Sequence, residues 1–229
     1  MPGSLGLAGP AEPRDGLLRA LLWQAATLHA PSELRVAFVG EPGSDTRWEW
    51  LGWLDHSVPL SNEANRSLRM VVSEERASSQ LLSTLLDEFS RRRDRVAQSK
   101  ARNESPPAFI TLLLVVVGSE RLRTQPVLGE IMRGGADYQM ALICVEERWE
   151  DVPSDCAAMV AVEVGGEARL AYAGQGWQPG RCVADSADLE ASDALARRLA
   201  RVKLALGGGR QDLSRNKRLF DMLGVADDA

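Results

Sequence analysis

The sequence predicts an α/β fold, in which a mainly parallel sheet lies between layers of helices and carries an antiparallel hairpin at one edge. Short apolar segments alternate with helical segments from the N-terminus to about residue 145. The run 109–117 is apolar at almost every residue, as in a strand that helices cover on both faces. Two later strand-like segments flank Gly165 and Gly166, which together favour a hairpin turn.

The N-terminal segment predicts a strand that leads directly into a helix. Residues 4–8 are a short apolar run followed by Gly9 and Pro10, which suits a buried strand and a turn. A helix is expected from there to just before Pro31, because apolar residues recur along one helical face. These residues are Leu17, Leu18, Leu21, Leu22, Ala25 and Leu28.

The next part predicts two strands and a long helix. The strands are expected at 34–39 and 68–72, and the helix runs from residue 74 to about residue 98. After a polar loop, further strands are expected at 109–117 and 140–145, with a short helix between them. That helix covers residues 125–133 and ends at two glycines.

The C-terminal part completes the predicted domain. The hairpin strands are expected at 159–164 and 168–173, and a last helix at 187–202. Three glycines then open a polar tail. We therefore divide the chain into a folded domain, residues 1–206, and a C-terminal linker, residues 207–229.

Composition excludes several functional classes. The chain has 229 residues and a net charge of −5, which argues against a broadly basic nucleic-acid surface. Its three cysteines form no zinc pattern or disulfide framework, and two histidines are too few for a His-rich metal site. The longest apolar run is shorter than the about 20 residues of a membrane-spanning helix, and residues 1–10 lack a signal-peptide pattern. We expect a soluble, intracellular domain.

In a nucleotide-binding protein with this α/β fold, phosphates bind at the turn after the first strand. A working P-loop reads GxxxxGK[ST], with the Lys on the phosphates and the hydroxyl on magnesium. Started at Gly9, the template places Arg14 on the second Gly, Asp15 on the Lys and Gly16 on the Ser/Thr. Asp15 would repel phosphates and Gly16 has no hydroxyl, so the sequence predicts a degenerate nucleotide site. Arg14 could still bind an anion at the N-terminus of the helix.

The strand at 109–117 has the pattern of a Walker B strand, which ends in an acid that helps to hold magnesium. Here the strand is followed by Gly118, and the first acid is Glu120, two positions late. Glu120 is either a displaced acid or a residue of the loop surface. We expect no catalytic residue, no metal ligand and no bound cofactor in this domain.

Five segments stand in a recognisable order. They are LGLAGPAEPRDGLLRALLWQAATLHA followed by PSELRVAFVG, WEWLGWLDH, FITLLLVVVGSERL with GGADYQMALICVEERWEDVPSDC, RLAYAG, and RLFDMLGV. Their order and spacing resemble the FtsK/SpoIIIE-type ATPases of type VII (ESX) secretion, called EccC in actinobacteria and EssC in firmicutes. WEWLGWLDH is similar to the family's WxWxxWLPH segment, with Asp55 in place of Pro.

The resemblance covers nearly the whole chain and fits the region between the transmembrane helices and the first motor module. It implies a degenerate RecA-like P-loop NTPase fold for residues 1–206, with residues 207–229 leading to the next module. ATP and Mg²⁺ would belong to the other modules. It also implies a place on the cytoplasmic side of the plasma membrane. The implied partners are the adjacent ATPase module and membrane subunits of the secretion complex, with a hexamer only in the full-length protein and no nucleic acid.

The function that the resemblance implies is a non-catalytic ATPase-like module that couples the membrane assembly to the motor domains during protein export. Two alternatives stay open. One is a nucleotide-binding or weakly hydrolysing ATPase domain. The other is a DNA-translocase domain of the FtsK type, against which the acidic charge counts.

Two surface features complete the sequence predictions. Trp48, Trp50 and Trp53 are either core residues or a contact surface for the next module or a neighbouring subunit. Residues 89–102, FSRRRDRVAQSKAR, form a basic cluster. That cluster is a solvated helix end, a subunit contact, or a contact for nucleic acid or lipid headgroups.

Overall fold

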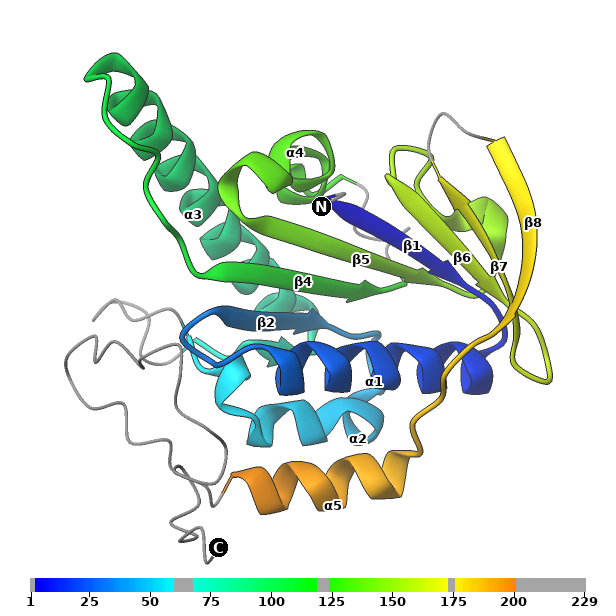
Figure 1. Cartoon of the computed structure of the whole chain (residues 1–229). Coiled ribbons are helices and arrows are strands. Elements are labelled where there is room, and N and C mark those ends of the chain that lie inside the picture. Colours follow the sequence, from blue (N-terminus) through cyan, green and yellow to red (C-terminus); the bar gives the residue numbers. More distant parts are fainter. Residues whose placement is uncertain (1–2, 60–67, 119–123, 173–175, 201–229) are drawn as a thin grey trace, which may run out of the picture.

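The computed structural model describes residues 3–59, 68–118, 124–172 and 176–200. One eight-stranded sheet with the order β3-β2-β4-β5-β1-β6-β7-β8 forms its centre (Figure 1). The strands are β1 Ser4–Ala8, β2 Leu34–Val39, β3 Val71–Val72, β4 Thr111–Val117, β5 Met140–Glu146, β6 Ala158–Val162, β7 Glu167–Tyr172 and β8 Gly176–Val183. Neighbours from β3 to β6 are parallel, whereas β7 and β8 pair antiparallel. The predicted α/β fold with an antiparallel edge is confirmed.

Helices cover both faces of the sheet. The α-helices are α1 Ala11–Leu28, α2 Asp45–Trp48, α3 Glu75–Ala101, α4 Pro126–Gly134 and α5 Leu189–Leu199. Short 3₁₀ helices are η1 Glu49–Trp53, η2 Asp55–Ser57, η5 Gly135–Tyr138 and η6 Trp149–Asp151. In Figure 1, α1, α2 and α5 lie on one face of the sheet, and α3 and α4 lie on the other. None of the helices in the described ranges is long and apolar enough to cross a membrane.

The two helix layers explain why β4 is apolar at every position after Thr111. Leu112, Leu114 and Val116 belong to the core beneath α3 and α4. Val115 and Val117 belong to the core beneath α1 and α5. Successive side chains of a strand point to opposite faces, so a strand covered on both sides needs an apolar residue at every position.

Some boundaries differ from the sequence predictions. The strand expected at 68–72 is reduced to Val71–Val72, and the last helix ends at Leu199 within the described residues. The edge strand β8 has no sequence prediction, since it contains Pro179 and two glycines, which are depleted in strands. An edge position tolerates proline because one side of the strand needs no hydrogen-bonded neighbour. The linker at 207–229 lies outside the described residues, so its boundary stays a prediction.

The three tryptophans do not share one environment. Trp48 is 2% exposed, with its ring centroid 4.8 Å from that of Phe38. Trp50 is 1% exposed and stacks on Trp23 at 5.2 Å. Trp53 is 44% exposed. The hypothesis of a tryptophan partner surface is therefore wrong for Trp48 and Trp50. The short helical turns lie over α1 and β2 and direct these two rings into the core.

Candidate functional site

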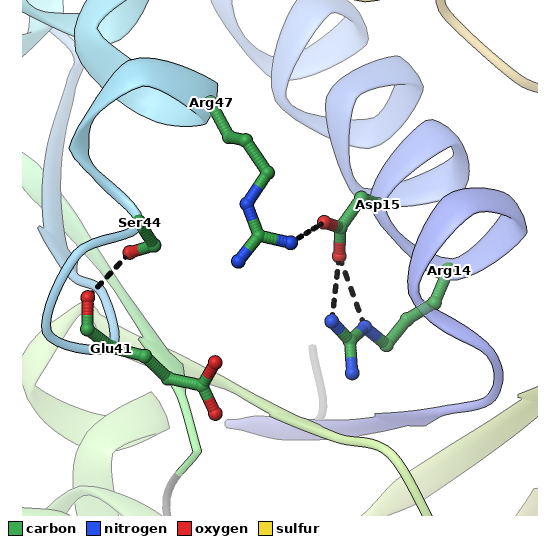
Figure 2. Close-up of polar contacts among 5 residues, drawn as sticks. All are labelled: Arg14, Asp15, Glu41, Ser44 and Arg47. Carbon is green, nitrogen blue, oxygen red and sulfur yellow. Dashed lines mark hydrogen bonds and ion pairs between the residues drawn. The ribbon is translucent and has the colours of Figure 1, made fainter.

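The candidate site lies where the carboxyl ends of the parallel strands meet, the usual ligand position in such sheets. α1 follows β1 and contributes Arg14 and Asp15. The loop after β2 contributes Glu41 and Ser44, and α2 contributes Arg47 (Figure 2). The sequence predictions include the two α1 residues. The other three come from a segment about thirty residues away in the chain and are brought to α1 by the parallel strand order.

Asp15 is held by two guanidinium groups. Arg14 donates to Asp15 Oδ1 from Nε at 3.0 Å and from Nη2 at 2.9 Å. Arg47 donates to Asp15 Oδ2 from Nη1 at 3.1 Å. Arg14 and Asp15 are each 3% exposed, whereas the side chain of Arg47 is 39% exposed. Both carboxylate oxygens therefore accept charged hydrogen bonds from within the domain, and Figure 2 shows the two arginines converging on them.

The backbone after β1 does not form a phosphate-binding loop. Only Gly9 and Pro10 separate β1 from α1, which begins at Ala11. The Arg14 N–H already donates to the Pro10 carbonyl at 3.1 Å. In a P-loop the backbone N–H groups between the first glycine and the lysine surround the phosphates. Here most of that stretch is helical, and Asp15 stands in the second turn of α1 instead of at its start.

Gly9 and Gly16, at the first and last positions of the aligned template, have packing reasons of their own. Gly9 has φ +146°, and a Cβ there would lie 2.3 Å from the carbonyl oxygen of Val162 at the end of β6. A Cβ on Gly16 would lie 2.3 Å from Ser186 Oγ, and the Gly16 carbonyl accepts from the Ala187 N–H at 3.0 Å. The segment that leads into α5 thus lies against the residue that the template aligns with the magnesium-binding hydroxyl.

Tertiary structure places an acid beside the end of β4, where the sequence has none. Gly118 has φ +66°, and a Cβ there would lie 2.7 Å from Glu41 Oε1. Glu41 belongs to the turn after β2, which Ser44 stabilises by donating to the Glu41 carbonyl at 2.6 Å. Sequence reasoning missed Glu41, although an acid in a Gly-Glu-Pro-Gly turn after a buried strand was a usable signal. Glu120 lies outside the described residues.

A third arginine borders the site. Arg19 is 8% exposed, and its Nε donates to the Ala187 carbonyl at 2.7 Å. Burial lowers the pKa of Arg19, while Asp15 and Asp188 oppose that effect. Arg19 thus connects α1 to the segment before α5, and its guanidinium lies 6.0 Å from the centre of the Trp48 ring. Its contacts are those of a structural residue.

The described residues offer no cluster of His, Cys, Asp and Glu that could hold a metal ion. None of Cys144, Cys156 and Cys182 forms a disulfide, and the first two are buried. Within the described ranges, the arrangement can hold an anion between guanidinium groups, and Asp15 already fills that role. Of the site residues predicted from sequence, Arg14 and Asp15 are found in an internal ion-pair cluster, and the relation of the predicted site to nucleotides stays a prediction.

Comparison with known sequences finds relatives in type VII secretion. No protein-family model matches the chain. The ESX-4 secretion system protein EccC4 of Mycobacterium tuberculosis is 28% identical over 181 residues, which cover 76% of this chain and 14% of that protein. The ESX secretion system protein EccC of Thermomonospora curvata is 32% identical over 57 residues, 24% of this chain and 4% of that protein. The chain thus spans a small part of the length of both relatives.

Solved structures share the fold. EssC (ATPases 2 and 3) from Geobacillus thermodenitrificans matches with a TM-score of 0.62 and 11% identity, over 86% of this chain and 43% of that one. The cytoplasmic domain of the Thermomonospora curvata type VII secretion ATPase EccC matches with a TM-score of 0.61 and 19% identity, over 88% of this chain and 28% of that one. The chain is thus similar in sequence to EccC proteins of type VII secretion and shares the fold of the EccC and EssC ATPase domains, which confirms the resemblance seen in its sequence.

Proposed function

We propose that this domain is a non-catalytic ATPase-like module of a type VII secretion motor, which couples the membrane assembly to the motor domains. The observation that carries the proposal is the carboxylate of Asp15, which the sequence template aligns with the phosphate-binding lysine and which is bound by Arg14 and Arg47. Phosphoryl transfer needs positive charge and free backbone donors around the phosphates. This site presents two arginines that are already bound to a carboxylate, and a helical backbone, instead.

A triphosphate would have to displace the carboxylate from its partners before it could bind there. Arg14 is 3% exposed, so separating it from Asp15 leaves a buried charge without its partner. The displaced carboxylate would then lie beside the phosphates, where like charges repel. The ion-pair cluster thus occupies the place of a ligand, and its Arg47–Asp15 contact links α2 to α1 without nucleotide.

Titration calorimetry of the full chain with magnesium-ATP, together with a phosphate-release assay, tests the non-catalytic part. We expect no binding with a Kd of about 1 mM or tighter, which corresponds to roughly −4 kcal/mol, and no phosphate release above background. Asp15→Lys alone should not restore turnover, because the backbone loop is still absent. Micromolar binding that Arg47→Ala abolishes would instead support the alternative, a nucleotide-binding or weakly hydrolysing domain.

The coupling part predicts a contact with the adjacent ATPase module of the same protein, on the cytoplasmic side of the membrane. We assign Trp53 to that contact, since it is the exposed member of the three tryptophans. Trp53→Ala should keep the domain folded and weaken its binding to the adjacent module. Tyr172→Ala is the control, because Tyr172 has a similar exposure of 47% but lies on the hairpin. Equal binding by both variants would contradict this assignment.

A further inference from the structure

The C-terminal part of α3 extends beyond the body of the domain. α3 has 27 residues, about 40 Å at 1.5 Å per residue, whereas β4 beneath it has seven residues, about 23 Å. Its last buried residue is Arg92, and no residue from 93 to 101 is buried. Figure 1 shows this end of α3 reaching past the sheet at the upper left. We call residues 91–102 the basic arm.

Charge is concentrated on the basic arm. It contains six Lys or Arg and one Asp, a net charge of +5, in a chain whose net charge is −5. Arg92 anchors the arm to the body: its Nε donates to Glu88 at 2.7 Å, and its Nη1 donates to the Tyr138 carbonyl at 2.9 Å. The remaining basic residues of the arm are exposed. The domain is therefore electrically polarised, with a cationic projection on an acidic body.

Part of that positive charge has no acidic partner. Arg91 pairs with Glu88 at 2.6 Å, and Arg93 lies 3.9 Å from Asp94. Within the described ranges, no carboxylate pairs with any of three further cations. These are Arg95, Lys100 and Arg102.

A shallow hollow lies beside the arm and contains both arginines and acids. It has a volume of about 330 Å³, and its lining includes the guanidinium groups of three arginines and the carboxylates of Glu88 and Asp94. The full lining is Glu88, Arg91, Arg92, Asp94, Arg95, Gln98 and Phe109. The Arg95 guanidinium lies 5.5 Å from the centre of the Phe109 ring. Arg91 and Arg92 already pair with Glu88, whereas Arg95 pairs with no carboxylate within the described ranges. Its guanidinium is therefore available to a phosphate group that approaches from solvent.

We propose that the basic arm docks on the anionic surface of a phospholipid bilayer, an inference that rests on the proposed function beside a membrane. Among the residues from 93 to 101 the apolar ones are Val96, Ala97 and Ala101, so the arm lacks the aromatic anchors that dominate protein interfaces. Attraction to anionic lipid needs only exposed Lys and Arg, at about 1 kcal/mol each near the surface. Contact through the end of the arm also keeps the acidic body farther from the bilayer surface than the Debye length, which is about 10 Å.

Vesicle co-sedimentation of the full chain tests this proposal. The probes are vesicles of phosphatidylcholine alone and vesicles with about 30 mol% phosphatidylglycerol, at about 0.05 M and 0.5 M salt. We expect binding to the anionic vesicles at low salt only. Arg95→Glu/Lys100→Glu should lower the partition onto anionic vesicles by about 30-fold, because two contacts of about 1 kcal/mol each are lost.

The control variant Arg76→Glu/Arg198→Glu makes the same change in net charge at exposed positions outside the arm. It should lower the partition by less than about threefold. Equal losses in both variants, or binding to phosphatidylcholine, would overturn the proposal. So would a short DNA duplex that binds the arm more tightly than the vesicles do, since that outcome assigns the arm to nucleic acid. Because this assay contains no ATP, its failure is distinguishable from failure of the non-catalytic proposal.

Discussion

Asp15→Asn is the substitution that probes the centre of the site most directly. It keeps the shape of the side chain but leaves Arg14, which is 3% exposed, without a charged partner. Breaking a buried ion pair by removing one partner costs about 3–5 kcal/mol. The amide oxygen can still accept one hydrogen bond, and the Arg47 pair is partly exposed and adds at most about 1 kcal/mol. We therefore expect a loss of about 3 kcal/mol.

Urea denaturation at neutral pH measures this loss, and the midpoint of thermal unfolding should fall by roughly 6–12 °C for a domain of this size. Asp193→Asn is the matched control. Asp193 pairs with Arg197 at 2.7 Å, and both side chains are exposed. That variant should lose about 0.5 kcal/mol or less.

A double variant separates the charge effect from packing. Arg14→Met/Asp15→Leu removes both members of the buried pair, and replacing a buried pair by apolar side chains is often neutral. It should be more stable than Asp15→Asn by about 2 kcal/mol. If Asp15→Asn instead loses less than about 1 kcal/mol, the carboxylate is not the counter-ion that stabilises the buried arginine, and the argument about the site is refuted.

The remaining predictions concern the fold around the site. Gly9→Ala should lower the free energy of unfolding by roughly 3 kcal/mol, because Gly9 has a positive φ and a Cβ there would approach a backbone oxygen of β6. Gly52→Ala is the control: a Cβ there meets open space, so stability should change by no more than about 1 kcal/mol. Denaturant midpoints measure both changes. Trp50→Ala should lower the free energy of unfolding by about 3–5 kcal/mol, because that ring is 1% exposed. Trp53→Ala should lower it clearly less, and similar losses in the two variants would contradict the different burial of the two rings. Asp188→Ala should cost about 1 kcal/mol, because Asp188 caps α5 by accepting from a backbone N–H at 2.9 Å; unchanged helix content and stability would refute the cap.

The sequence predicted the α/β architecture because hydrophobic periodicity is a local property. β2 is found at the predicted residues 34–39, and β4 lies within the predicted run 109–117. The weak elements were the ones that depend on neighbours: β3 keeps two residues beside β2, and β8 forms only because β7 offers it a free edge. Pairing of that kind leaves little trace in the composition of the strand itself.

The candidate site also has features that the sequence predicted and features that only the tertiary structure shows. The sequence alone showed that Asp15 stands where a lysine is needed and that Gly16 lacks a hydroxyl. It did not indicate that Arg47 would reach Asp15 from another segment, or that Glu41 would stand beside Gly118. Those contacts depend on the order of β1, β5, β4 and β2 in the sheet, which brings loops distant in the chain to one edge.

The sequence by itself determined the class of fold, the family resemblance and the prediction of a degenerate phosphate-binding site, because each of these depends on which residues follow one another. Tertiary structure decided which contacts the residues at that site make. Packing buries Arg14 against Asp15 and brings Arg47 to the same carboxylate. It also places Trp48 and Trp50, but not Trp53, in the core. Burial and charge pairing between distant segments are properties of packing, and a linear pattern does not specify them.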